Sequence, residues 1–390
     1  MSNLKEGLNY IFYEKIFDIP KINWIENFFL TPNYLGMLEI ANPIGMKFKY
    51  LTIKDKDDII AFFYFQIIPF NASNSLQAKQ NPTSHKDTFN SCMKSFLSNF
   101  IQFKTIVVGN LTLTGANGFE FNPKYVEYNN DQFINQTIEK TIQHINQLGE
   151  NISLILLKDF PFVNKKNDFY YHKKYFPFCI DPDMNFELNK TWENTDDYTA
   201  DFTTKYRTRY NRARKKLGLI QKKELSLDEI QIYSNEIYAL YLKIAEKADF
   251  NTVTLSSNYF LELKKYLNDN CKIFGYFLEN RLVSFVSLIT IDKELEAHYI
   301  GYEPSLNAHH QLYLNMLYDI VDFGITHKFQ NIGFARTASE IKSSIGATAN
   351  QYYCYLKHTK PIINKCIPAL FQYFTPVENW EPRNPFKKMD

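Results

Sequence analysis

Cysteines are few in this sequence, and their spacing offers no structural use for them. Five cysteines are scattered over 390 residues, and no two of them form a Cys-x-x-Cys pair. An odd and dispersed set argues against a disulfide framework and against a structural zinc site. We therefore expect a reducing compartment, a cytoplasmic protein, and no bound metal.

Long hydrophobic runs and a strong excess of one charge are missing as well. No uninterrupted apolar run approaches the roughly 20 residues that a membrane-spanning helix needs, and residues 1–7 contain no apolar signal core. The formal net charge is only +2, so no global field recruits DNA or an anionic membrane. We expect no transmembrane segment and no DNA partner, and any anionic ligand must meet a local patch.

Several catalytic signatures are absent. The sequence has no Walker or dinucleotide glycine fingerprint, no His-Glu-x-x-His and no nucleophile elbow. These absences weaken interpretations as an ATPase, a dehydrogenase, a zinc hydrolase or an α/β-hydrolase. The content of 45% hydrophobic and 22% charged residues fits a soluble globular protein, and the length suits two domains better than one core.

The most informative stretch comprises residues 272–334. Residues rich in β-branched and aromatic side chains, separated by turns, predict a three-strand antiparallel meander over 272–278, 281–291 and 294–302. A helical pattern follows Pro304 and ends near Gly324, and residues 330–334 predict another short strand. The first half of the chain repeats this order of elements. We therefore predict an α+β fold with two similar domains, residues 1–188 and 189–390, each a mostly antiparallel mixed sheet flanked by helices.

A basic segment lies between the two predicted sheets. Residues 205–216 contain seven basic residues and no acid, and they follow two threonines that can cap a helix. On a helical wheel, tyrosines share the stripe that would dock the helix, while Arg209 and Arg212 lie on an outward stripe. One interpretation is a solvated helix face. The other is an anion site for the phosphates of a cofactor, a lipid-linked sugar or RNA, since arginine forks suit phosphate oxygens.

The strand predicted over residues 294–302 carries ionisable side chains. Its period of two places Glu296, His298, Ile300 and Tyr302 on one face. Such a series costs desolvation energy unless it lines a cleft. Glu296 or His298 could deprotonate an amine nucleophile, and Tyr302 could donate a proton. The alternative is a hydrogen-bonded core histidine beside an edge-exposed glutamate.

Polar residues also flank the predicted long helix. The preceding loop, residues 303–310, would leave the free amides of that helix to meet a pyrophosphate. Arg336, Glu340 and Lys342 follow the next strand, close to where a cleft would open. Arg336 and Glu340 are four residues apart, so they can also pair with each other.

An ordered set of short motifs resembles a known family. The set is Lys205-Tyr-Arg-x-x-Tyr-Asn-Arg-Ala, Gly275-Tyr-Phe, His298-Tyr-Ile-Gly-Tyr302, Gly333-Phe-Ala-Arg-Thr337 and Glu340-Ile-Lys-Ser-Ser-Ile-Gly346. It is similar to the FemAB-like branch of the GNAT acyltransferases, which includes the BioF2-like acetyltransferase domain. The resemblance is best over residues 191–357, and residues 109–119 are similar to the corresponding part of the first domain.

The resemblance implies tandem GNAT folds that transfer an acyl group from acyl-CoA, or an aminoacyl group from charged tRNA, to an amine. The donor thioester would lie between the strands 294–302 and 330–334. Donor contacts would come from Ile300, Gly301, Asn307, His310 and Gln311, and anionic parts would be held by Arg209, Arg212, Arg336 and Lys342. The superfamily's pyrophosphate loop is rich in glycine, whereas this chain has Pro304-Ser-Leu-Asn-Ala-His-His-Gln311, with none.

These observations predict an N-acyltransferase with Glu296 and His298 as candidate bases and Tyr302 as the candidate acid. The expected donor is acyl-CoA, with acetyl-CoA first, and the expected acceptor is an amine on a small molecule or a cell-envelope precursor. Two alternatives stay open. One is a tRNA-dependent aminoacyl ligase of cell-wall precursor synthesis, and the other is a non-catalytic binding module that has kept the fold.

Overall fold

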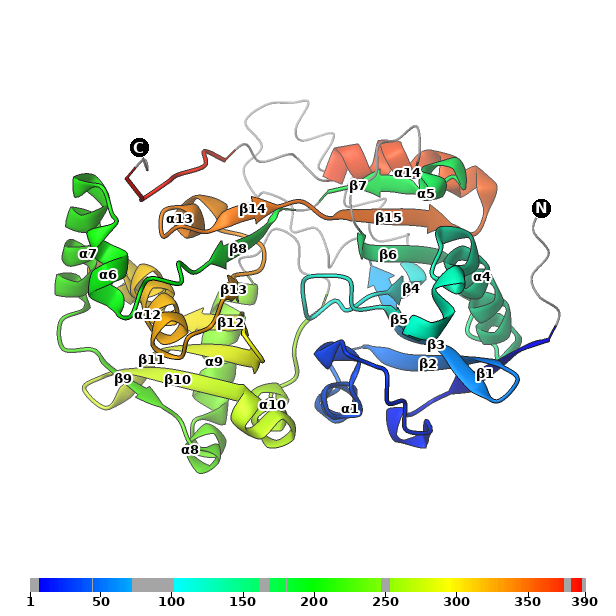
Figure 1. Ribbon diagram of the computed structural model, residues 1–390, viewed down its shortest axis with the longest axis horizontal. Helices are drawn as coiled ribbons and strands as arrows, with labels where there is room; N and C mark the ends of the chain where they lie inside the picture. The colour runs from blue at the N-terminus through cyan, green and yellow to red at the C-terminus, as the bar shows by residue number, and fades with distance from the viewer. Residues whose placement is uncertain are drawn as a thin grey trace. The chain divides into compact units, whose positions relative to one another are not determined.

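The computed structural model describes residues 7–43, 45–71, 102–160, 168–179, 181–246, 253–374 and 380–387. It contains two mixed sheets flanked by helices (Figure 1), which confirms the predicted α+β class. The chain divides into two compact units. Unit 1 consists of Met1–Ile180, Asp249–Ser256 and Tyr352–Val377, and unit 2 consists of Asp181–Ala248, Ser257–Gln351 and Glu378–Asp390.

The sheet of unit 1 has the strand order β1-β2-β3-β4-β6-β15-β7, and β5 pairs with β3. Its strands are β1 (Leu8–Tyr13), β2 (Lys47–Asp55), β3 (Asp58–Asn71), β4 (Gln102–Val108), β5 (Phe119–Phe121), β6 (Leu154–Phe160), β7 (Phe176–Phe178) and β15 (Tyr353–His358). The pairing of β4 with β6 is parallel, and the other pairings are antiparallel. The accompanying α-helices are α1 (Pro32–Ala41), α4 (Asp131–Gln147), α5 (Phe169–His172) and α14 (Pro361–Phe374).

The sheet of unit 2 has the order β14-β8-β13-β12-β11-β10-β9. Its strands are β8 (Asp183–Glu187), β9 (Gln221–Glu224), β10 (Cys271–Leu278), β11 (Arg281–Ile291), β12 (Glu294–Tyr302), β13 (Asn331–Gly333) and β14 (Thr348–Asn350). The predicted antiparallel meander is confirmed as β10-β11-β12. The helices are α6 (Thr195–Ala200), α7 (Thr204–Leu217), α8 (Leu227–Ile232), α9 (Ser234–Ala245), α10 (Tyr259–Leu267), α11 (Pro304–His310), α12 (Leu312–Thr326) and α13 (Ser339–Ser343).

Two strands cross the boundary that the sequence suggested. Strand β8 precedes residue 189, yet it pairs with β13 and β14 in unit 2. Strand β15 lies far into the second half of the chain, yet it pairs with β6 and β7 in unit 1. The division into residues 1–188 and 189–390 stays a prediction. It follows the order of the elements along the chain, and that order does not reveal that β8 and β15 pair with strands on the far side of the predicted boundary.

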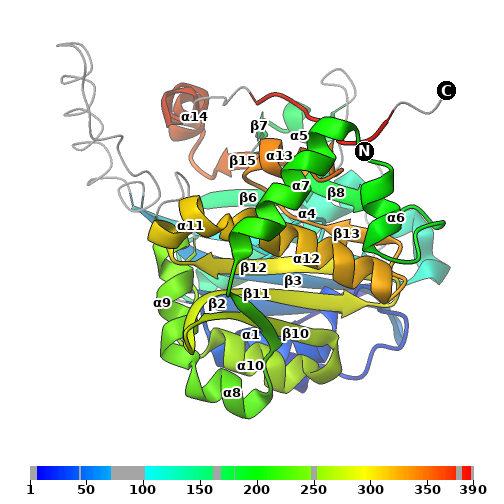
Figure 2. The same ribbon diagram turned by 90° about the vertical axis from the view of Figure 1, so that its left-hand side faces the viewer.

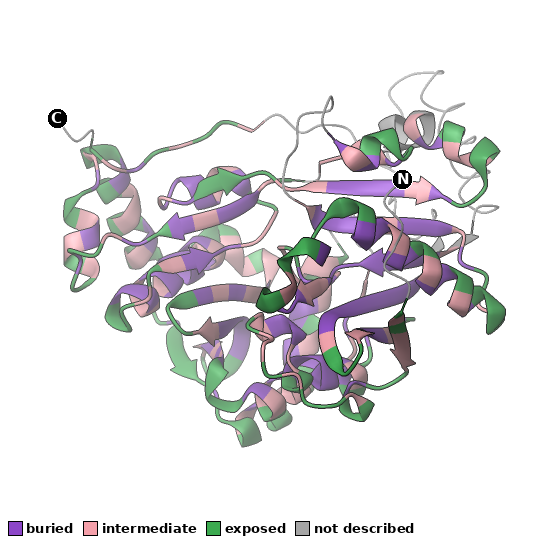
Figure 3. Cartoon of the chain, turned by 45° about the vertical axis from the view of Figure 1, so that its right-hand side comes forward, coloured by how far each residue is buried: buried purple, intermediate pink, exposed green. Residues whose placement is uncertain are grey.

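Each unit has its own hydrophobic core. In unit 1, the apolar stripe of α4 packs on β3, β4 and β6 through side chains such as Ile138 and Ile142. In unit 2, ten residues of α12 are buried, and eight of them belong to the hydrophobic core over β11 and β12. The central strands of both sheets are mostly buried (Figure 3), as expected for sheets covered on both faces.

Gly301 sets how closely helix α9 approaches the other face of strand β12. A Cβ atom at this position would lie 2.8 Å from the carbonyl carbon of Leu240 and 2.8 Å from the nitrogen of Tyr241, both in α9. Backbone therefore packs directly on backbone here, and no larger residue fits without moving the helix. Strand β12 is thereby held between α9 on one face and α12 on the other.

The sequence also predicts no disulfide framework and no transmembrane segment. No disulfide joins any two of the four cysteines in the described residues, and Cys92 lies outside them. None of the helices in the described ranges has the length and apolar character needed to cross a lipid bilayer.

Candidate functional site

Strands β12 and β13 lie side by side over only three residue pairs, which end at Glu296 and Gly333. Beyond this point the chain after β13 follows β8 instead, since the Phe334 nitrogen donates to the Met184 carbonyl oxygen at 2.7 Å. Strand β12 continues to Tyr302 with β11 as its neighbour. A fork therefore opens between the two strands. Within the described residues, the β12 edge that faces this fork has no strand partner over residues 297–302.

A β-bulge lies two residues beyond the last β12–β13 pair. Ser287 of β11 pairs with Tyr299, and Leu288 pairs with Ala297, so His298 is the extra residue of β12. The Ser287 hydroxyl fixes the bulge, because its oxygen accepts from the Tyr299 nitrogen at 3.0 Å and donates to the Tyr299 carbonyl at 3.2 Å. A bulge bends its strand and turns the following side chains to the opposite face.

The bulge changes the predicted arrangement of side chains along β12. Leu295 and Ala297 lie in the core that includes α12, and beyond the bulge Ile300 and Tyr302 pack against the same core. Glu296 alternates with Leu295 and Ala297, so it lies on the other face of the strand. The expectation that one face carries Glu296, His298, Ile300 and Tyr302 is therefore wrong, because a strict period of two does not survive an inserted residue.

His298 is held by the helix layer on its side of the sheet. Its Nε2 atom lies 2.8 Å from the hydroxyl oxygen of Tyr259 in α10, and the two rings stack. Burial lowers the pKa of His298 to about 3, so the imidazole is neutral near neutral pH. Tyr259 is itself fully buried. These contacts favour the interpretation of a hydrogen-bonded core histidine over that of a general base.

Glu296 lies where the fork begins. A Cβ atom at Gly333 would come within 2.3 Å of Glu296 Oε2, so the carboxyl group occupies the space that the missing side chain of Gly333 leaves open. Burial raises the pKa of Glu296 to about 8, and the charges of Asp183 and Glu294 act in the same direction. No described residue hydrogen-bonds to this carboxyl group. A carboxyl group with a pKa near the working pH can both accept and release a proton.

Lys342 lies beneath the loop that follows β13. Its ammonium donates to the carbonyl oxygens of Arg336 at 2.6 Å and Ala335 at 3.3 Å, and only 4% of the residue is exposed. Burial lowers the pKa of Lys342 to about 7, although Asp183 and Asp181 oppose the change. Lys342 therefore holds a loop backbone, a role that the prediction of an anion-binding lysine did not include.

In that loop, three residues other than glycine adopt positive φ angles: Ala335 at 53°, Thr337 at 69° and Ala338 at 51°. Left-handed conformations at such residues are costly and collect at functional sites. Glu340, which its spacing could pair with Arg336, binds Arg383 with an oxygen–nitrogen distance of 2.6 Å. The backbone at Arg336 is thus fixed through Lys342, next to the fork.

The segment before α12 is a helix and not a loop. Pro304 begins α11, and Gln311 joins α11 to α12 with a left-handed φ of 50°. The Asn307 side chain accepts from the Tyr313 nitrogen at 3.0 Å, and His310 Nδ1 lies 3.1 Å from the Lys216 carbonyl oxygen. The residues expected to contact a donor pyrophosphate, Asn307, His310 and Gln311, thus connect α11 with α12 and α7.

Helix α7 crosses α12, and its C-terminal end lies beside α11 (Figure 2). Tyr206 and Ala213 are buried in the core of unit 2, and the Tyr210 ring packs edge-on against that of Tyr318. The predicted docking stripe is therefore the contact face. Arg209 and Arg212 form no ion pair with any described residue, and Arg212 is exposed.

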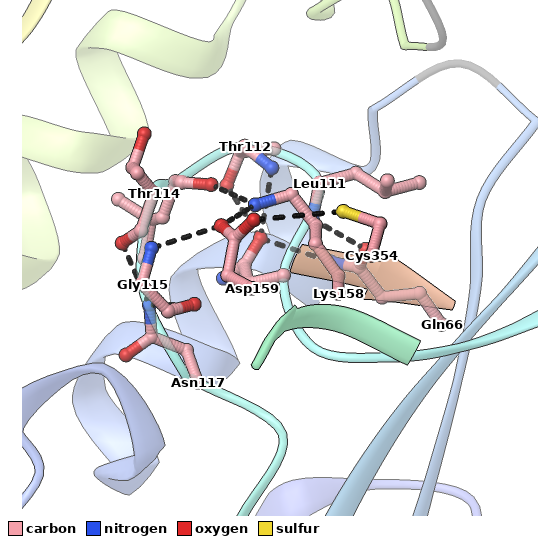
Figure 4. A network of polar contacts seen from close by, with 11 residues as sticks. Gln66, Leu111, Thr112, Thr114, Gly115, Asn117, Lys158, Asp159 and Cys354 are labelled. Carbon is pink, nitrogen blue, oxygen red and sulfur yellow. Dashed lines mark hydrogen bonds and ion pairs between the residues drawn. The ribbon is translucent and has the colours of Figure 1, made fainter. Parts of the chain in front are cut away.

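Unit 1 has an equivalent fork with different contents. Strands β4 and β6 part after Val108 and Leu157, and residues 109–118 form a loop before the chain returns to β3 as β5. Lys158 Nζ donates to the Leu113 carbonyl at 2.6 Å and pairs with Asp159, which also accepts from the Gly115 nitrogen at 2.9 Å (Figure 4). Lys158 and Asp159 were not among the predicted site residues, although two charged residues at the end of an apolar strand are a signal in the sequence.

Comparison with known proteins gave matches among solved structures alone. No family model and no curated protein matches the chain. The chain is similar to FemX, with 11% identity over 89% of this chain and 94% of that one, at a TM-score of 0.47. It is also similar to a tandem GNAT protein from the clavulanic acid biosynthesis pathway, with 8% identity over 84% and 88% of the two chains and a TM-score of 0.48.

A GCN5-related N-acetyltransferase from Sphaerobacter thermophilus is similar as well, with 8% identity, coverage of 80% and 81%, and a TM-score of 0.42. Structures similar to this chain thus include FemX and GNAT proteins.

Proposed function

We propose that the protein is an N-acyltransferase and that the fork of unit 2 is its acyl-transfer site. The observation that carries this proposal is the position of Glu296 at the apex of the fork, next to the open edge of β12. Peptide N–H groups on such an edge can stabilise the negative charge that forms on a carbonyl oxygen during acyl transfer. A carboxyl group beside that edge can take the proton that the attacking amine must lose.

The reaction begins with an amine acceptor and an acyl thioester. The amine nitrogen attacks the carbonyl carbon, a C–N bond forms, and the oxygen becomes an anion that the β12 edge stabilises. Ionised Glu296 accepts the proton of the nitrogen. Collapse of the intermediate breaks the C–S bond, and the thiolate that leaves receives the proton back from Glu296. If Tyr302 donates this proton instead, Glu296 loses its proton to solvent and the tyrosinate takes one from solvent, which restores both groups. The products are an amide and a free thiol, so atoms and charge balance.

The pKa of Glu296 suits this role. An alkylamine has a pKa near 10, so a base with a pKa of about 8 accepts its proton far more readily than an ordinary carboxylate. Burial raises the pKa of Tyr302, so its hydroxyl is protonated and can act as a donor. Tyr302 and Glu296 lie on opposite faces of β12, which assigns the acid and the base to different sides of the strand.

We take an acyl-CoA as the donor class, with acetyl-CoA as the first to test, and a primary amine on a small molecule or an envelope precursor as the acceptor. The fork requires an acyl donor whose carbonyl carbon is joined to a good leaving group. An aminoacyl ester of tRNA meets the same requirement and is the alternative donor.

The test is acetyl transfer to a panel of primary amines, measured through the thiol that is released. Glu296→Gln is expected to lower kcat/KM by roughly 100-fold or more, the usual contribution of a general base. Glu236→Gln is the control, because Glu236 lies on α9 in the same unit, is exposed, and forms no ion pair with a described residue. Its activity should stay within about twofold of the unchanged protein. Full activity in Glu296→Gln would contradict the proposal.

A further inference from the structure

The N-terminus of helix α12 is poorly suited to bind a phosphate. A pyrophosphate site at a helix N-terminus needs backbone N–H groups that point into open space. Here the Tyr313 nitrogen already donates to Asn307 Oδ1 at 3.0 Å. Helix α11 stands directly before α12, and Asn315 Nδ2 ties them together by donating to the carbonyls of His310 and Gln311 at 3.1 and 3.2 Å.

The same contacts attach helix α7 to this junction. Asn315 Nδ2 also lies 2.9 Å from the Ala213 carbonyl, and His310 Nδ1 lies 3.1 Å from the Lys216 carbonyl. Tyr313 packs its ring against Tyr302 at the end of β12, with 5.9 Å between ring centroids. A continuous path of contacts therefore leads from the open end of the fork, through the start of α12, to the C-terminal half of α7.

Helix α7 carries cations that the fold does not use. Arg207 donates to the carbonyls of Thr199, Ala200 and Phe202, and Arg214 pairs with Asp319 at 2.7 Å. The other five cations form no ion pair with a residue in the part of the chain that the structure describes: Lys205, Arg209, Arg212, Lys215 and Lys216. Residues 202–223 include no acid at all.

The helix dipole explains only part of this pattern. Cations near a helix C-terminus are stabilised by the partial negative charge there, which accounts for Lys215 and Lys216. Lys205 lies in the first turn, where a cation is disfavoured and acidic residues are absent. Arg209 and Arg212 lie in the middle of the helix, where the dipole has little effect. With Lys216 they form a stripe at positions i, i+3 and i+7, which lie on one side of a helix.

We propose that the phosphate groups of the acyl donor bind along this stripe of α7, through Arg209, Arg212 and Lys216, and not at the N-terminus of α12. The inference rests on the proposed function. It identifies the donor as a thioester on a phosphorylated small carrier, because guanidinium groups match phosphate oxygens in pairs. The stripe begins at Lys216, where α7 contacts α11, and extends over about two turns of α7.

Two thioesters with the same reactive end test the proposal. Acetyl-CoA carries the phosphates, and S-acetylpantetheine lacks them. Isothermal titration should give the unchanged protein a Kd for acetyl-CoA at least about tenfold below that for S-acetylpantetheine, since charge-assisted contacts are the stronger kind. The triple variant Arg209→Gln, Arg212→Gln, Lys216→Gln should lose this difference and keep its Kd for S-acetylpantetheine.

The control removes the same amount of charge elsewhere in unit 2. Lys223, Lys265 and Lys272 each pair with an acidic side chain, and their replacement by Gln should change the acetyl-CoA Kd less than twofold. Thermal melting of both triple variants checks that they fold. A similar loss of affinity in the control would assign the effect to the overall field and overturn the proposal.

The outcomes separate this inference from the proposed function. If the unchanged protein acetylates amines from both thioesters and the α7 variant retains the tenfold preference, the phosphates bind elsewhere and only the inference fails. If neither thioester binds or reacts, the proposed function fails. If an RNA stem-loop binds with the same dependence on the three residues while acetyl-CoA shows no preference, the stripe belongs to a nucleic acid, and the small-carrier assignment is overturned.

Discussion

The two units contain the same fork and fill it differently. In each sheet one parallel pair, β4 with β6 or β12 with β13, is joined through a long helix and borders an antiparallel neighbour, β3 or β11. In unit 2, the pairing of β12 with β11 is interrupted by a single extra residue of β12, His298. In unit 1 the interruption comprises residues 109–118, between the pairs Val108–Phe65 and Phe119–Phe63.

The length of the interruption determines what the fork holds. A one-residue bulge leaves the edge of β12 open and places Glu296 at the apex. The longer loop of unit 1 enters its own fork, where Lys158 and Asp159 bind its backbone at Leu113 and Gly115. One topology therefore produces an open edge with a protonatable carboxyl group in unit 2 and a loop fixed by an ion pair in unit 1.

The largest expected effect comes from breaking the ion pair of unit 1. Asp159 is fully buried and Lys158 is 7% exposed, so Asp159→Ala removes the carboxylate that pairs with a buried ammonium. We expect a loss of about 3–5 kcal/mol in the free energy of unfolding, measured by urea denaturation. The double variant Lys158→Met, Asp159→Ala should lose less, because no unpaired charge stays buried. An equal loss in both variants would contradict this account of the loop.

The pH dependence of stability tests the environment of Glu296 in the other fork. Its pKa is raised from 4.5 to about 8 on folding, so the folded state prefers the protonated form. The stability it contributes is full below pH 4.5 and is lost as the pH rises toward 8. The melting temperature of Glu296→Gln, relative to that of the unchanged protein, should therefore increase between pH 5 and pH 9. A difference that is constant with pH would show that Glu296 is solvated.

A smaller effect is expected from a change in the bulge of β12, which distinguishes the fork of unit 2 from that of unit 1. Ser287→Ala removes the hydroxyl that bonds both backbone groups of Tyr299 and should cost about 1 kcal/mol of unfolding free energy. Acyl transfer should fall with it, because the edge of β12 is no longer held in place. Ser284→Ala is the matched control on the same strand, since the Ser284 hydroxyl is buried and has no hydrogen-bond partner among the described residues. Equal losses from both substitutions would argue against a special role for the bulge.

The fold was predictable where local patterns determine it. The alternation of apolar residues and turn signals in residues 272–302 indicated the meander, and apolar residues at helical spacing indicated α12. The position of the fork followed from the order of strand, helix and strand. Residues 303–310 were predicted as a loop, and this was wrong, because Pro304 at the first position of α11 favours a helix start and no glycine interrupts the segment.

The details of the site depend on contacts between distant residues. The bulge at His298 is fixed by Ser287 on the neighbouring strand, and a period of two along β12 cannot reveal it. Asp159 acquires its role from Gly115, 44 positions earlier in the chain. The exchange of β8 and β15 between sheets is likewise a tertiary choice. Glu296 was predicted as a base, and that role stays a prediction. Its raised pKa follows from burial over Gly333, which no spacing encodes.

The number of donor sites tests the central claim, that the fork of unit 2 and not that of unit 1 accepts the acyl donor. Isothermal titration of the full chain with acetyl-CoA should give one site per chain. Gly333→Val places side-chain atoms where the Glu296 carboxyl group lies, so it should abolish this binding while thermal melting shows a folded protein. Two sites per chain, or a single site that Gly333→Val leaves intact, would contradict the account.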